Sequence, residues 1–79
     1  MKVPRSVNAK DLIKVLEQYG YILVRQGGSH IRMSKTIIDK KHSVTIPNHN
    51  PMKIGTFQKI AKEVCVFNKL SVKEFYSKL

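Results

Sequence analysis

Apolar residues recur with the period of an α-helix in three stretches of the chain. The first stretch begins after Asn8, a favourable N-cap, and ends at Gly20, which favours a helix stop. The second begins at Thr56, the expected N-cap, and the third follows Ser71, whose spacing to Glu74 is that of a capping box. The apolar stripes of these predicted helices are Ala9, Leu12, Ile13 and Leu16; Phe57, Ile60, Ala61 and Val64; and Val72, Phe75, Tyr76 and Leu79.

Between the first two predicted helices the pattern is typical of strands. Residues 21–26 are rich in β-forming side chains, and residues 29–34 return after Gly27-Gly28, a strong signal for a two-residue hairpin turn. A polar turn is expected over residues 35–41 and a third strand over residues 42–46. The order α-β-β-β-α-α predicts an α+β fold, in which a three-stranded antiparallel sheet carries its helices on one face.

The expected turn sets the register of the first hairpin. With Gly27-Gly28 as the two turn residues, Arg25 lies opposite His30, and directly opposed residues share a face. A register slip of one residue would reverse the faces. The face predicted to lie under the helices carries Ile22, Val24, Ile31 and Met33, and the open face carries Leu23, Arg25, His30 and Arg32.

The charge balance narrows the function. Fifteen Lys and Arg residues against five Asp and Glu residues give a formal net charge of +10, and a polyanionic partner would relieve the resulting repulsion. Nucleic acid is the first candidate, while an anionic membrane surface, an acidic protein or a merely solubilising surface are the alternatives. No apolar run approaches the roughly 18 residues that cross a bilayer. The length of 79 residues predicts a single domain, residues 1–79. The lone Cys65 and the lack of an apolar leader favour the cytoplasm.

His30 between Arg25 and Arg32 is the candidate for chemistry on RNA. A neutral imidazole can take the proton of a ribose 2′-OH near pH 7, and the two guanidinium groups could hold the phosphate and stabilise its developing charge. At Gly28 and Ser29 the small residues leave room for an RNA backbone to approach. The alternative is an ordinary solvated histidine at a strand end.

Further basic residues follow the third predicted strand. His49 could contact phosphate, act as a second acid–base group, or simply cap a loop. Lys53 precedes a helix start whose free N–H groups could bind phosphate, and Lys59 and Lys62 could extend that contact or form a solvated helix face. His42 is interpreted as a strand-edge residue without a chemical role.

From about Val7 to Phe75 the sequence resembles the HicA-type toxins, the mRNA interferases of toxin–antitoxin pairs. The resemblance rests on Asp11–Leu16 followed by Gly20-Tyr21, on Val24–His30 with its Gly-Ser-His core, on Val44–Pro47 before His49, and on Gly55-Thr56. It implies a double-stranded-RNA-binding-like fold, cleavage of mRNA with His30 as the catalytic residue, translation arrest, and neutralisation by a HicB-type antitoxin. The family is not known for a metal cofactor, and none is expected here.

The sequence departs from the family pattern in two places. Many members carry a second histidine directly after the catalytic one, where this chain has Ile31. Because the predicted register turns Ile31 toward the core, this difference need not affect the chemistry. The stretch Cys65–Lys69 looks longer than the usual link between the last two helices.

Three hypotheses follow from these observations. The first is a metal-independent endoribonuclease that uses His30, and the second is a module of the same fold that binds RNA without cutting it. The third is an interaction protein whose positive surface mainly binds an acidic antitoxin. The toxin hypothesis predicts that the antitoxin covers the open face of the sheet and blocks His30.

Overall fold

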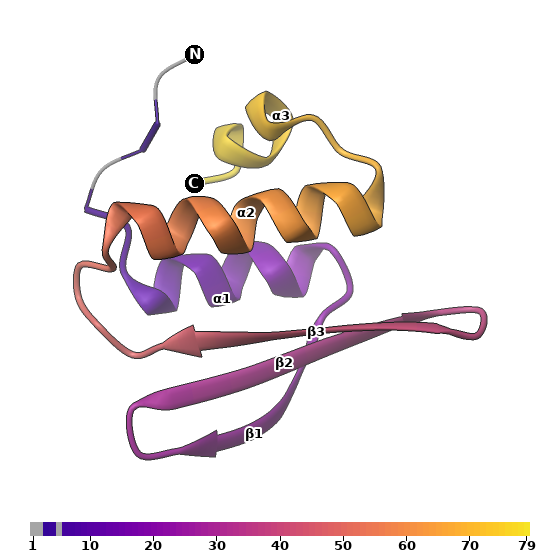
Figure 1. Ribbon diagram of the computed structural model, residues 1–79, viewed down its shortest axis with the longest axis horizontal. Helices are drawn as coiled ribbons and strands as arrows, with labels where there is room; N and C mark the ends of the chain where they lie inside the picture. The colour runs from indigo at the N-terminus through magenta and orange to yellow at the C-terminus, as the bar shows by residue number, and fades with distance from the viewer. Residues whose placement is uncertain (1–2, 5) are drawn as a thin grey trace.

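The computed structural model describes residues 3–4 and 6–79. Its elements are α1 (Ala9–Gln18), β1 (Ile22–Gly27), β2 (His30–Ile37), β3 (Lys40–Pro47), α2 (Ile54–Asn68) and α3 (Val72–Ser77). The strands form one antiparallel sheet with β2 in the centre, and the helices lie on one side of it (Figure 1). The predicted α+β order and the one-sided packing are therefore confirmed.

The core lies between the sheet and the helices. Alternate side chains of β2 and β3 point into it, and they meet the apolar stripes of α1 and α2. α3 closes the other side of this helix layer, where Phe75 stacks on Tyr19 at 5.9 Å and Tyr76 stacks on Phe57 at 5.6 Å between ring centroids. The largest fully buried side chains are Tyr21, Phe57, Phe75, Leu12, Leu16, Met33, Ile46 and Val64.

Two of the three predicted helix starts are confirmed. The backbone N–H of Asn8 donates to Oδ2 of Asp11 at 3.1 Å, and Oγ of Ser71 accepts from the N–H of Glu74 at 3.0 Å. The expected N-cap at Thr56 is wrong, because α2 already begins at Ile54. Lys53 holds the N-cap position there without a side-chain hydrogen bond, so the first N–H groups of α2 have no side-chain cap.

α2 also ends later than the sequence suggested. The stretch Cys65–Asn68, expected as part of a link, continues the helix, and Lys69 ends it with a left-handed φ of 57°. Buried Cys65 extends the apolar face, and Nδ2 of Asn68 donates to the carbonyl of Val64 at 2.8 Å. The chain therefore reverses after Asn68, at residues 69–71.

The first hairpin turns one residue later than predicted. Gly28-Ser29 form the turn, with a φ of +57° at Gly28, and Gly27 pairs with His30. A positive φ at the first central residue is the requirement of a type II′ turn, which glycine meets without strain. Moving the turn by one residue changes the pairing by two, so the face assignment survives: Arg25 pairs with Arg32 and stays on the open face with His30.

For the residues of β1 that precede Arg25, the predicted register is wrong. An irregularity between Leu23 and Arg25 shifts the register, so that Leu23 lies opposite Met33 and Ile22 opposite Ser34, the reverse of the predicted faces. Ile22 and Val24 are 65% and 52% exposed, so they are not covered by the helices as predicted. Every residue of β1 is exposed, because this edge strand lies beyond the packed part of the sheet.

The second hairpin is much longer than predicted. Instead of a polar turn over residues 35–41, the pairing continues to Ile37 opposite Lys40, and the turn is only Ile38-Asp39. Backbone hydrogen bonds sustain these strand ends, whereas the prediction relied on burial. The hairpin tip consequently extends past the ends of the helices (Figure 1).

Candidate functional site

His30 is the first residue of β2 and lines two neighbouring hollows. The first hollow, of about 360 Å³, lies on the open face of the sheet and is lined by Arg25, Gly27, His30, Arg32 and Thr45. Nη1 of Arg32 donates to Oγ1 of Thr45 at 3.3 Å across the β2–β3 pair. Cross-strand neighbours on one face thus bring both guanidinium groups beside the imidazole.

The second hollow, of about 270 Å³, lies between the end of the sheet and the start of α2. It is lined by His30, Pro47, His49, Met52, Lys53 and Thr56. His49 and Lys53 reach it from the loop that follows β3 and from the helix N-cap position. A second imidazole and an ammonium group therefore share one cavity with His30.

Backbone hydrogen bonds hold the two histidine-bearing segments together. The N–H of Asn48 donates to the carbonyl of Ser29 at 2.7 Å, which joins the loop after β3 to the turn before His30. The same loop is fixed to the N-terminal part of the chain. Oδ1 of Asn50 accepts from the N–H of Ala9 at 3.2 Å, and the N–H of Met52 donates to the carbonyl of Val7 at 2.8 Å. The site is thus built on an anchored loop.

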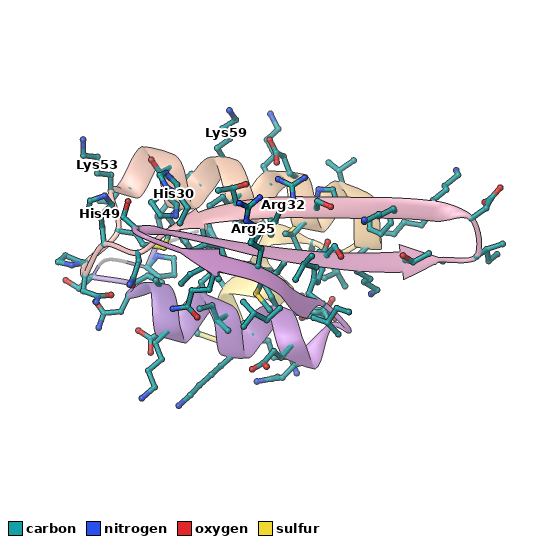
Figure 2. The ribbon with its side chains drawn as sticks, turned by 90° about the horizontal axis from the view of Figure 1, so that it is seen from below. Arg25, His30, Arg32, His49, Lys53 and Lys59 are labelled. Atoms are coloured by element: carbon teal, nitrogen blue, oxygen red, sulfur yellow. The ribbon has the colours of Figure 1, made fainter. Side chains whose placement is uncertain are left out.

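The structure brings most of the predicted site residues together around His30. Arg25 and Arg32 lie on one side of it, and His49 and Lys53 lie on the other, at one end of the sheet (Figure 2). Gly28 and Ser29 form the turn that presents His30 but line neither hollow. Both histidines are exposed to solvent, so a large substrate can reach them.

Two residues that line the second hollow, Pro47 and Met52, were not predicted as part of the site. Thr56 also lines it, and Gly55-Thr56 was the helix start at which the sequence suggested phosphate binding. Met52 is only 5% exposed, and its side chain closes the hollow toward the core. No sequence signal marked Met52, because a methionine in a proline-containing loop has neither periodicity nor a turn role.

The site is cationic and has no carboxylate among the residues that line its two hollows. Within residues 3–4 and 6–79, no group of three or more His, Cys, Asp and Glu side chains is placed to hold a metal ion. Imidazole, guanidinium and ammonium groups together are suited to binding phosphate and to moving protons near it.

Comparison with known proteins places the chain in a family. The family model of the HicA toxins of bacterial toxin–antitoxin systems matches residues 9–65, which is more than half of the chain. The chain belongs to the HicA toxin family. No curated protein and no solved structure matches it. Membership in the HicA family implies a partner protein in a toxin–antitoxin pair.

The HicA match covers every candidate residue of the site. It extends from the start of α1 to Cys65 in α2, and therefore includes both hollows but not α3. Across the part of the HicA chain that the structure describes, no helix has the length and apolarity to cross a membrane.

The remaining histidine of this HicA chain, His42, packs against other side chains of the fold and lines neither hollow of the site. The hydroxyl of Tyr21 lies within hydrogen-bond distance of Nδ1 of His42, at 2.6 Å, and it accepts from Nδ2 of Asn68 at 3.1 Å. The ring of His42 stacks on Phe67 at 4.9 Å. Burial lowers the pKa of His42 below its ordinary value, against a smaller opposing effect of Glu63.

Proposed function

We propose that this HicA-family toxin is an endoribonuclease that cleaves mRNA with His30 as its acid–base residue. The observation that carries the proposal is the position of His30 between the two hollows, with Arg25 and Arg32 on one side and His49 and Lys53 on the other. An RNA strand crossing this end of the sheet would place a phosphate near three basic side chains and two imidazoles. Loss of intact mRNA would then arrest translation.

The arrangement suits cleavage by the neighbouring 2′-OH. Neutral His30 takes the proton of the ribose 2′-OH, and the 2′-oxygen attacks the phosphorus atom. Guanidinium groups of Arg25 and Arg32 stabilise the charge that develops on the phosphate oxygens. The bond to the 5′-oxygen breaks, and that oxygen needs a proton. The products are a 2′,3′-cyclic phosphate and a free 5′-OH.

His49 is the side chain best placed to give that proton. It shares the second hollow with His30 and stands beside Lys53. In its protonated form, an imidazole can donate to the leaving oxygen while its neighbour accepts the first proton. Both proton transfers are then served by side chains of the chain itself, and the proposed reaction requires no metal ion.

A His30→Ala variant tests the role of His30. We expect RNA cleavage by the purified variant, in the presence of EDTA, to fall at least about a hundredfold, because general acid–base catalysis typically contributes that much. His49→Ala should also slow cleavage, with retained RNA affinity. Lys73→Ala serves as the control, because Lys73 is an exposed residue of α3 and its charge lies far from the sheet.

Each result distinguishes the proposal from its alternatives. A His30→Ala protein that cuts RNA as fast as the wild type would exclude His30 as the acid–base residue. A wild-type protein that binds RNA without cutting it would support the non-catalytic RNA-binding module. Wild-type activity that EDTA abolishes would contradict the metal-independent mechanism.

The proposal extends to the partner. We expect a HicB-type antitoxin to neutralise the toxin by covering the open face of the sheet at His30, where Arg25 and Arg32 offer positive charge to acidic side chains. An inhibited complex in which His30 remains accessible to RNA would require a different explanation of inhibition.

A further inference from the structure

An apolar groove lies at the end of the molecule opposite His30. Its largest hollow, of about 570 Å³, lies between the β2–β3 hairpin tip and the end of α2, and its lining residues are Ile37–Lys40 and Val66–Lys69. His30 and Ile37 are the two ends of β2, seven residues apart, which corresponds to about 23 Å in a strand. The groove is therefore separate from the proposed catalytic residues.

Three exposed apolar side chains line this groove. Ile38 is 95% exposed, Val66 is 72% exposed, and Ile37 is 41% exposed. Ile38 also has a φ of 57° at the first central position of the turn, where Gly28 stands in the other hairpin. A β-branched residue in this conformation is strained, and here neither burial nor turn geometry explains the isoleucine. Contact with another molecule is the remaining explanation.

The groove continues along the furrow between β3 and α2. A hollow lined by His42, Lys62, Glu63, Val66 and Phe67 shares Val66 and Phe67 with the groove at the tip. The next hollow shares Glu63 with it and contains Lys59, and it shares Thr56 with the hollow at His30. Lys53 and Lys59 project from the same side of α2 (Figure 2). One continuous path thus leads from apolar to basic surroundings and ends at His30.

We infer that this furrow binds a segment of the protein partner whose apolar side chains occupy the groove at the hairpin tip and whose acidic side chains follow toward His30. Charge complementarity supports this occupant, because the lysines along the furrow are Lys40, Lys53, Lys59, Lys62 and Lys69, against Asp39 and Glu63. A second copy of the chain carries the same net charge of +10 and is disfavoured. The inference rests on the proposed function in one respect: the acidic end of the segment would compete with RNA at His30.

Binding of the co-purified antitoxin to toxin variants tests this inference, with His30→Ala as the background so that the toxin can be produced. We expect Val66→Glu to weaken the affinity at least about tenfold, as loss of an apolar anchor does at protein interfaces. Val66→Lys should weaken it less, because the lysine restores attraction to acidic side chains. Ile38→Asn should also weaken binding. Leu79→Glu, an exposed apolar residue that follows α3, is the matched control and should bind as the parent does.

RNA cleavage by Val66→Glu with His30 intact separates this inference from the proposed function. Unchanged cleavage together with weakened antitoxin binding supports the furrow as a partner site. Unchanged antitoxin affinity would overturn it. So would weakened RNA binding by Val66→Glu, a wild-type dimer that the variant dissociates in sedimentation, or binding to phosphatidylcholine–phosphatidylglycerol vesicles that the variant loses. His30→Ala alone tests cleavage, so either hypothesis can fail without the other.

Discussion

Ile38 shows how a single residue can depart from the conformation its type prefers. The two hairpins of the sheet share a positive φ at their first turn residue, which is Gly28 in one and Ile38 in the other. Glycine adopts this conformation freely, whereas an L-residue with a Cβ atom pays about 1–2 kcal/mol. The sequence Ile-Asp carries no signal for a two-residue hairpin turn, so the turn was predicted too long, over residues 35–41, and its strain was not predicted. Strain at a fully exposed position is more consistent with a binding role than with a folding role.

Ile38→Asn should stabilise the protein. Asparagine tolerates the left-handed conformation, and the isoleucine side chain makes no buried contact that would be lost. We expect the free energy of unfolding, measured by urea denaturation, to rise by about 1 kcal/mol. Ile37→Asn is the control, because Ile37 has no positive φ and should show no gain. A variant at position 38 that is no more stable than wild type would show that the turn carries no strain.

At the scale of elements, periodicity was sufficient for the type and order of every helix and strand. It was insufficient for their ends. Residues 35–37 and 40–41 read as a polar turn because their side chains are not buried together, although their backbone groups continue the ladder. The face of Arg25, His30 and Arg32 was predicted correctly, because the turn moved by one residue and the pairing by two. The contact of His49 with the same hollow depends on a loop, whose path no periodic pattern encodes.

His42 of β3 packs against Phe67 of α2, and its burial predicts that the free energy of unfolding depends on pH. Burial lowers the pKa of His42 in the folded protein, while the unfolded chain binds a proton near the ordinary value of about 6.5. The unfolded state therefore binds more protons as the pH falls below about 6.5, and the free energy of unfolding must decrease there. Lys35, Lys62 and Glu63 are charged groups near His42, and Nζ of Lys35 donates to Oδ1 of Asn68 at 2.5 Å.

His42→Asn should reduce this acid destabilisation. The asparagine amide can donate a hydrogen bond to the Tyr21 hydroxyl or accept one from it, in place of Nδ1 of His42, but asparagine does not titrate. Urea denaturation at a series of pH values would measure the slope. Lys41→Asn, a neighbouring exposed change, should retain the wild-type slope. An unchanged slope in His42→Asn would assign the acid sensitivity to another group.

At the scale of the whole molecule, the net charge of +10 is spread over sheet and helices, yet the proposed site uses only part of it. The double variant Arg25→Gln/Arg32→Gln and the double variant Lys10→Gln/Lys73→Gln remove equal charge at different places. In a His30→Ala background, we expect the arginine pair to weaken binding of a single-stranded RNA more than about tenfold. Its slope of log affinity against log salt should become shallower by about 1.4, which is the loss of two phosphate contacts.

The lysine pair should weaken binding only slightly, because both residues lie on helices away from the open face. Equal losses in the two double variants, measured by fluorescence anisotropy at several salt concentrations, would mean that RNA responds to diffuse charge. In that case Arg25 and Arg32 would not define a site.

The hydrogen bond from the N–H of Asn48 to the carbonyl of Ser29 helps to assemble the proposed site without using any side chain. It joins the turn before His30 to the loop that carries His49, and both of its atoms belong to the backbone. Substitutions at positions 29 and 48 therefore leave this hydrogen bond possible. Proline at position 48 is the exception, because proline has no N–H. Such a chain can change the side chains around the proposed site while the two backbone segments that carry His30 and His49 stay joined.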